Sequence, residues 1–192
     1  MEEEEQPAET LIFGKEMEQK ITFVGLTGAG KTTLLRTIIG AKPDVHVHPT
    51  LGMDLEVVRI KDREYLACDM GGQIGFAMSL WKPHLASSLG VLFVFDSADP
   101  AKVQEARHWL NQTVKWIRSD AVLLFLANKK DLEEAMSLEK IVSQLNLTKL
   151  MTQRPHTFAI YQISALYNDG VDEAMHWLNE RVERIPEAGD ND

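Results

Sequence analysis

Residues 25–32 have the sequence Gly-Leu-Thr-Gly-Ala-Gly-Lys-Thr, between a short apolar run at 21–24 and a helical pattern at 31–39. A glycine, four further residues and then Gly-Lys-Thr, placed between a strand and a helix, is typical of a loop that binds nucleotide phosphates. The glycines let backbone N–H groups turn toward phosphate oxygens, and the N-terminus of the helix adds a partial positive charge. We predict that six consecutive residues contact the phosphates: Gly28, Ala29, Gly30, Lys31, Thr32 and Thr33.

The side chains of this loop and of a second motif predict a metal ion beside the phosphates. Lys31 is expected to reach the β- and γ-phosphates, and the Thr32 hydroxyl is expected to ligate Mg²⁺. A second motif, Asp-Met-Gly-Gly-Gln, ends a predicted strand. In it we expect Asp69 to hold Mg²⁺ through water, the Gly72 N–H to donate to the γ-phosphate, and Gln73 to orient the attacking water.

A third motif selects the base. Residues 128–131, Asn-Lys-Lys-Asp, follow a buried apolar run and so lie at the carboxyl end of the sheet, where open α/β folds bind ligands. The Asp131 carboxylate can accept from both N1–H and N2–H of guanine, whereas adenine offers no such pair of donors. Because a hydrogen bond to a charged group contributes about 1.5–3 kcal/mol, two of them discriminate strongly. The motif therefore predicts a guanine nucleotide, with Asn128 and Asp131 at the base.

Strand and helix patterns alternate along the chain, which predicts an α/β fold. The continuous apolar runs at 90–95 and 121–127 are typical of strands buried on both faces of a parallel sheet, and 53–70 has the pattern of a hairpin. We predict a three-layer P-loop NTPase fold with about six mostly parallel strands and about five helices. The predicted strands are 21–24, 53–60, 65–70, 90–95, 121–127 and 157–163, and clear helical spacing covers 31–39, 103–117, 137–145 and 170–182.

The length of the chain and the distribution of its charge predict one domain between two acidic tails. The chain has 192 residues and a formal net charge of −9, but residues 1–10 hold five acids without a base and 186–192 hold three acids without a base. We expect both ends to be flexible acidic tails around one domain at 11–185. The body has no basic stripe, which argues against a nucleic-acid partner. One cysteine, no apolar stretch near the ~20 residues of a membrane span, and an acidic start predict a cytoplasmic protein.

Together these motifs resemble those of the Arf family of small GTPases within the Ras-like superfamily. The stretches that carry the resemblance are Asp69–Gln73 with its paired glycines, Pro49-Thr50-Leu51-Gly52, Asp96-Ser97 and Asn128–Asp131. The resemblance covers roughly residues 11–184. It implies a Mg²⁺-dependent GDP/GTP switch with slow GTP hydrolysis, which recruits trafficking- or signalling-type partners.

The resemblance also implies roles for residues whose own pattern is weak. Thr50 would be the switch I threonine, which ligates Mg²⁺ and senses the γ-phosphate. Lys129 would pack its stem on the base plane. Ser164, Ala165 and Leu166 would form the final guanine loop, with the Ala165 N–H on the base oxygen.

An exchange factor, an activating protein and effectors are implied as partners, the effectors through switch I, switch II and the 53–70 hairpin. In Arf proteins this hairpin slides in register when the nucleotide changes. The chain departs from the family at these surfaces: Met53, Cys68 and His84 replace an aromatic triad, and switch II at 74–81 lacks the usual charged residues. No named Arf partner is therefore transferred.

The amino terminus departs as well. Residues 11–15 are similar to the end of the Arf amphipathic helix, but Glu2 excludes N-myristoylation and an acidic run precedes them. We expect this segment to dock on the protein body, with peripheral membrane association in the GTP state as the other outcome.

Two other function classes remain open. The first is a GTP-binding structural subunit or adaptor that does not cycle, which the altered switch II favours and the intact Thr50 and Gln73 oppose. The second is a P-loop metabolic kinase, which Asn128–Asp131 opposes and which equal affinity for ATP and GTP would restore.

Overall fold

The computed structural model describes residues 19–41, 50–73, 75 and 77–185. Residues 1–18, 42–49, 74, 76 and 186–192 lie outside the described residues. The predictions of flexible tails and of a docked amino-terminal segment therefore stay predictions.

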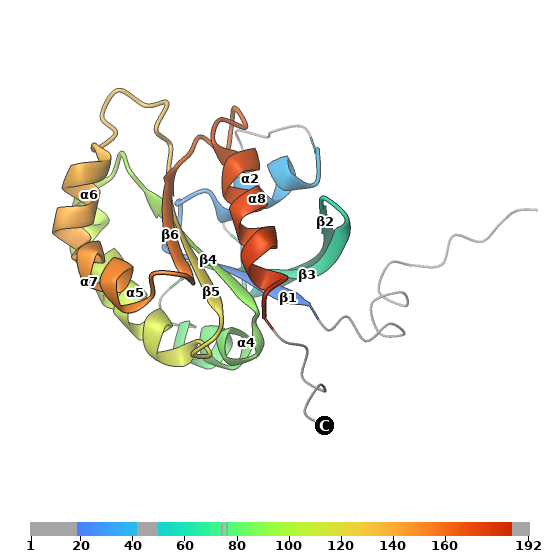
Figure 1. Cartoon of the computed structure of the whole chain (residues 1–192). Coiled ribbons are helices and arrows are strands. Elements are labelled where there is room, and N and C mark those ends of the chain that lie inside the picture. The colour runs from blue at the N-terminus through green and yellow to red at the C-terminus, as the bar shows by residue number, and fades with distance from the viewer. Residues whose placement is uncertain (1–18, 42–49, 74, 76, 186–192) are drawn as a thin grey trace, which may run out of the picture.

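Six strands form one sheet in the order β2-β3-β1-β4-β5-β6 (Figure 1). The pair β2–β3 is antiparallel, and the other neighbours are parallel. The mostly parallel sheet predicted from the sequence is confirmed. The strands are β1 (Lys20–Val24), β2 (Met53–Ile60), β3 (Arg63–Met70), β4 (Gly90–Asp96), β5 (Val122–Asn128) and β6 (Phe158–Gln162).

Helices cover both faces of the sheet, which gives the expected three layers (Figure 1). One hydrophobic cluster joins the sheet to α4–α7 and the other joins it to α2 and α8. The α-helices are α2 (Lys31–Ile38), α4 (Lys82–Ser87), α5 (Val103–Trp116), α6 (Leu138–Leu145), α7 (Leu147–Gln153) and α8 (Val171–Val182); a π-helical turn covers Ala77–Trp81 and a 3₁₀ turn covers Pro100–Lys102.

The part of the chain that the structure describes has six α-helices where the sequence predicted about five. The two short helices, α4 and α7, had no predicted segment of their own. In α7 only Leu147 and Leu150 are buried, so the apolar spacing is too short to reveal a helix. Asn146, with φ 56°, ends α6 in the left-handed conformation and α7 begins directly after it.

The neighbouring strands β4 and β5 are buried at every residue, as their apolar runs predict. They pair in register, with Phe93 stacked on Phe125 at 5.7 Å between ring centroids. Such a rigid centre fixes the loops that leave the carboxyl ends of the strands, where the predicted motifs lie. No described helix is both long and apolar enough to cross a bilayer.

A chain of hydrogen bonds, buried at Tyr65 and partly exposed at Arg63, joins the β2–β3 hairpin to α8 and the residue that follows it. The fully buried Tyr65 hydroxyl donates to Asn179 Oδ1 at 2.7 Å, Asn179 Nδ2 donates to Glu183 Oε1, and Arg63 donates to the same carboxylate oxygen. Burial raises the pKa of Tyr65 to about 12. The folded protein therefore retains this proton after the unfolded chain has lost it.

We expect Tyr65→Phe to lower the free energy of unfolding by about 1–3 kcal/mol, because Asn179 Oδ1 is left buried without its donor. The exposed Tyr167→Phe is the matched control, with an expected change within about 0.5 kcal/mol. Urea unfolding followed by tryptophan fluorescence measures both. Because the pKa of Tyr65 is higher in the folded protein, titration of this phenol lowers the stability of the wild type as pH rises from 10 to 12. The Y65F protein lacks this pH-dependent loss of stability. Equal free energies of unfolding for Y65F and Y167F would show that the hydrogen bond from Tyr65 to Asn179 contributes nothing to stability.

Candidate nucleotide site

The loop between β1 and α2 brings the first motif together. Gly30 has φ 93°, and a Cβ there would collide with the Asn128 amide, so only glycine fits this turn. Lys31 is 6% exposed and its Nζ donates to the carbonyl oxygens of Gly25 at 2.9 Å and Leu26 at 3.1 Å. The ammonium thus lies within the curve of the loop.

Burial lowers the pKa of Lys31 to about 8, the nearby Asp69 carboxylate opposes that shift, and Lys102 adds to it. Burial disfavours the charged form of a lysine, and an anion that binds beside it stabilises that charged form. The environment of Lys31 is therefore one in which phosphate oxygens replace the two carbonyl acceptors favourably.

Three oxygen-bearing side chains converge beside Lys31. The Thr32 hydroxyl donates to Asp69 Oδ2, and the Thr32 and Thr50 hydroxyl oxygens are 2.9 Å apart. Thr50 also donates to Asp69 Oδ2 at 3.4 Å. The sequence predicted all three residues at one site, and the fold brings them there from α2, β3 and the residue that follows the 42–49 loop.

This cluster fits a small hard cation. Asp69 is fully buried, and its Oδ1 has no hydrogen-bond partner among the described residues. Burial raises the pKa of the Asp69 carboxyl, against the opposing effects of Thr32 and Lys31. A divalent cation restores the favourable environment that the buried carboxylate lacks, and Mg²⁺ prefers such oxygen ligands.

The Gly71–Gln73 segment lies against the phosphate loop. A Cβ on Gly72 would overlap the Thr27 backbone, so Gly72 touches the loop directly. Gly71 is held on both sides, because its N–H donates to Gly52 at 2.8 Å and its carbonyl accepts from the buried Trp81 indole at 3.1 Å. Gln73 follows as a half-buried residue. The role of Trp81 was missed in the sequence, where it looked like one more apolar residue of switch II.

Asn128 joins the phosphate loop to the predicted guanine loop. Its Nδ2 donates to the Ala29 carbonyl at 2.9 Å, and its Oδ1 accepts from the Ala165 N–H at 2.9 Å. The side chain is 2% exposed. Asn128 therefore positions two loops, a contribution that motif spacing alone does not reveal.

The remaining base-site residues lie around this junction. Lys129, with φ 68°, forms an ion pair with Asp96 Oδ2 at 2.5 Å, and Asp131 is exposed at the rim. Ser164 is buried, and its Oγ has no partner among the described residues. Leu166 is half-buried in the same loop. The three motifs thus meet at one end of the sheet, with the aspartate free to contact a ligand.

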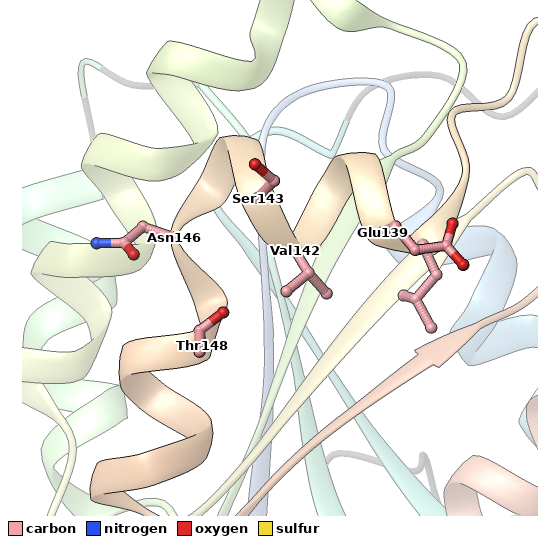
Figure 2. Close-up of a pocket in the computed structure, with 6 residues that line it drawn as sticks. Glu139, Val142, Ser143, Asn146 and Thr148 are labelled. Carbon is pink, nitrogen blue, oxygen red and sulfur yellow. The ribbon is translucent and has the colours of Figure 1, made fainter.

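A depression that lies apart from these motifs is formed by residues of α6 and the start of α7 (Figure 2). Its volume is about 520 Å³ and none of the predicted site residues lines it. The residues that line it are Leu138, Glu139, Val142, Ser143, Asn146 and Thr148.

Comparison with known proteins agrees with this geometry. The model of the ADP-ribosylation factor (Arf) family matches residues 8–182. The chain belongs to the Arf family. It is therefore a small GTP-binding protein of the P-loop GTPase class, and the family resemblance inferred from the motifs is confirmed.

Two solved structures are similar to this Arf-family chain. The Arl6 BBS3 small GTPase from Trypanosoma brucei, with bound nucleotide analogue GppNp, has a TM-score of 0.75 and 29% identity, covering 86% of this chain and 98% of that one. The mammalian SRP receptor structure has a TM-score of 0.73 and 22% identity, covering 85% of this chain and 100% of that one. The second likeness supports the fold alone.

Proposed function

We propose that this Arf-family chain is a Mg²⁺-dependent GDP/GTP switch that hydrolyses GTP slowly. The observation that carries the proposal is the meeting of Lys31, the Thr32–Thr50–Asp69 cluster and the exposed Asp131 at one edge of the sheet. In this proposal the backbone of 28–33 and Lys31 bind the phosphates. The base lies between Lys129 and the 164–166 loop, with Asp131 on its N1–H and N2–H.

Thr32 and Thr50 would ligate Mg²⁺ directly, and Asp69 would hold it through water. The ion would neutralise charge on the β- and γ-phosphates. Thr50 precedes the 53–70 hairpin and Gly72 follows it. Both would contact the γ-phosphate, so its presence would be sensed at both ends of the hairpin. Loss of that phosphate would release both contacts and so report the nucleotide state.

Gln73 would orient the attacking water. The 45–48 stretch, Val-His-Val-His, offers no arginine to stabilise the developing charge. GTPases that lack such an arginine turn over on the order of 10⁻⁴ s⁻¹, and an arginine supplied by an activating protein adds about 10³–10⁵-fold. We therefore propose a slow timer that depends on an activating protein and an exchange factor.

Partners would dock on switch I, switch II and the hairpin. Leu55 and Val57 on β2 are 38% and 43% exposed, which supports an apolar contact there. Cys68 is fully buried, so in the described state it is closed to a partner. We propose a cytoplasmic location in which the amino-terminal segment docks on the protein body, with peripheral membrane association in the GTP state as the alternative.

Single-turnover hydrolysis tests the proposal. The purified chain is loaded with one equivalent of GTP and Mg²⁺, and GDP is quantified over hours. Cleavage on the order of 10⁻⁴ s⁻¹ is expected. Tight GTP binding without cleavage would overturn the switch and favour a structural adaptor that does not cycle, which the uncharged switch II at 74–81 suggests.

Chelation of Mg²⁺ tests the metal cluster. We expect excess EDTA to accelerate release of a fluorescent GDP by about tenfold or more, because Asp69 and the phosphates lose their shared counter-charge. Thr32→Ala is expected to show fast release even in Mg²⁺, with little further response to EDTA. Thr148→Ala, an exposed threonine on α7 away from the site, is the control and should retain the EDTA response. A T32A protein with the wild-type response would exclude this cluster as the metal site.

A further inference from the structure

Lys102 contacts the phosphate loop, although it lies 75 positions along the chain from Thr27. Its Nζ donates to the Thr27 carbonyl at 3.2 Å and pairs with Asp99 Oδ2 at 3.1 Å. A Cβ on Gly28 would lie 3.9 Å from the same ammonium. The lysine therefore contacts the middle of the loop, at the peptide between Thr27 and Gly28.

This position opposes the usual preference for charge at a helix end. Lys102 is the residue before α5, which has 14 residues, and no side chain caps that helix. Cations are unfavourable at a helix N-terminus, where serine, threonine, aspartate or asparagine is preferred. The contacts with Asp99 and the Thr27 carbonyl offset that cost, which indicates a role in the loop rather than in the helix.

The peptide between Thr27 and Gly28 transmits the contact. In a trans peptide the carbonyl and the N–H point in opposite directions. Because Lys102 Nζ holds the Thr27 carbonyl, the Gly28 N–H is directed away from Lys102. The Lys102 ammonium is also close enough to act electrostatically on an anion bound by the loop, because a Cβ on Gly28 would lie 3.9 Å from its Nζ.

We propose that Lys102 is a positioning residue for nucleotide binding: it fixes the Thr27–Gly28 peptide so that the Gly28 N–H faces the phosphates, and its charge attracts the triphosphate. This inference rests on the proposed function. It adds the Lys102 side chain to the groups that form the phosphate site. Its charge acts on bound GDP and GTP alike.

The test measures dissociation of fluorescent GTP and GDP from the full chain with Mg²⁺. Lys102→Met keeps the stem and removes the charge and the donor, so dissociation is expected to accelerate about tenfold, the effect of one hydrogen bond with a charged donor. Lys102→Arg should restore the wild-type rate. The difference between wild type and K102M should shrink as salt rises, because the lysine is partly exposed.

Lys115→Met, the same change at the exposed far end of α5, is the control. If the wild type binds guanine nucleotide and K102M dissociates from it at the same rate as K115M, the inference is overturned while the proposed function stands. If K102M accelerates release but K102R does not restore it, Lys102 has a merely structural role and the inference is overturned as well. If wild type binds no guanine nucleotide, the proposed function itself fails.

Discussion

Asp131→Asn is expected to lower the affinity for GTP by about 100-fold or more while creating affinity for xanthosine triphosphate. The carboxylate accepts from N1–H and N2–H of guanine, and each such bond contributes about 1.5–3 kcal/mol. An asparagine keeps one acceptor for N1–H but presents an amide donor toward N2–H. Xanthine has an oxygen at that position, so the same amide pairs with it. Competition against a fluorescent GTP analogue measures both changes.

Asp131 is exposed, so the substitution should leave the fold unchanged. Asp62→Asn, an exposed aspartate in the turn between β2 and β3, is the matched control and should bind GTP like the wild type. A D131N protein that retains its full preference for GTP over xanthosine and adenosine triphosphates would remove the basis for assigning guanine to this site.

Gln73→Leu is expected to slow single-turnover GTP cleavage roughly 100-fold, the lower end of what a positioned polar side chain contributes to proton-coupled attack. GTP affinity should stay within about threefold, because Gln73 lies beyond the loop that binds the phosphates. Gln144→Leu, an exposed glutamine on α6, controls for the loss of an amide. Unchanged cleavage in Q73L would assign the water to another group and leave Gln73 without a catalytic role.

Much of the fold follows from sequence pattern because the pattern reports burial. The runs at 90–95 and 121–127 predicted buried strands, and β4 and β5 are buried throughout. The alternation at 53–60 predicted β2 with the bounds that the structure has. Short elements such as α4 were not predicted, since six residues are too few for a helical period to appear.

The candidate site was predictable where spacing is local, and less so where contacts span the chain. The loop at 25–32 and the motif at 128–131 each carry their chemistry within eight residues. By contrast, Asn128 joins Ala29 to Ala165, and Lys102 contacts Thr27. Contacts of this kind depend on strand order, which no local pattern specifies. The contacts that these residues are proposed to make with a bound nucleotide stay predictions.

Competition on the wild-type chain tests the central claim most directly. Fluorescent GTP is bound in the presence of Mg²⁺ and displaced by unlabelled GTP, ATP or xanthosine triphosphate in separate titrations. We predict displacement by GTP at a concentration at least about 100-fold lower than by either rival, since only guanine offers two donors to Asp131. Equal displacement by ATP and GTP would contradict a guanine switch and restore a nucleotide-dependent kinase.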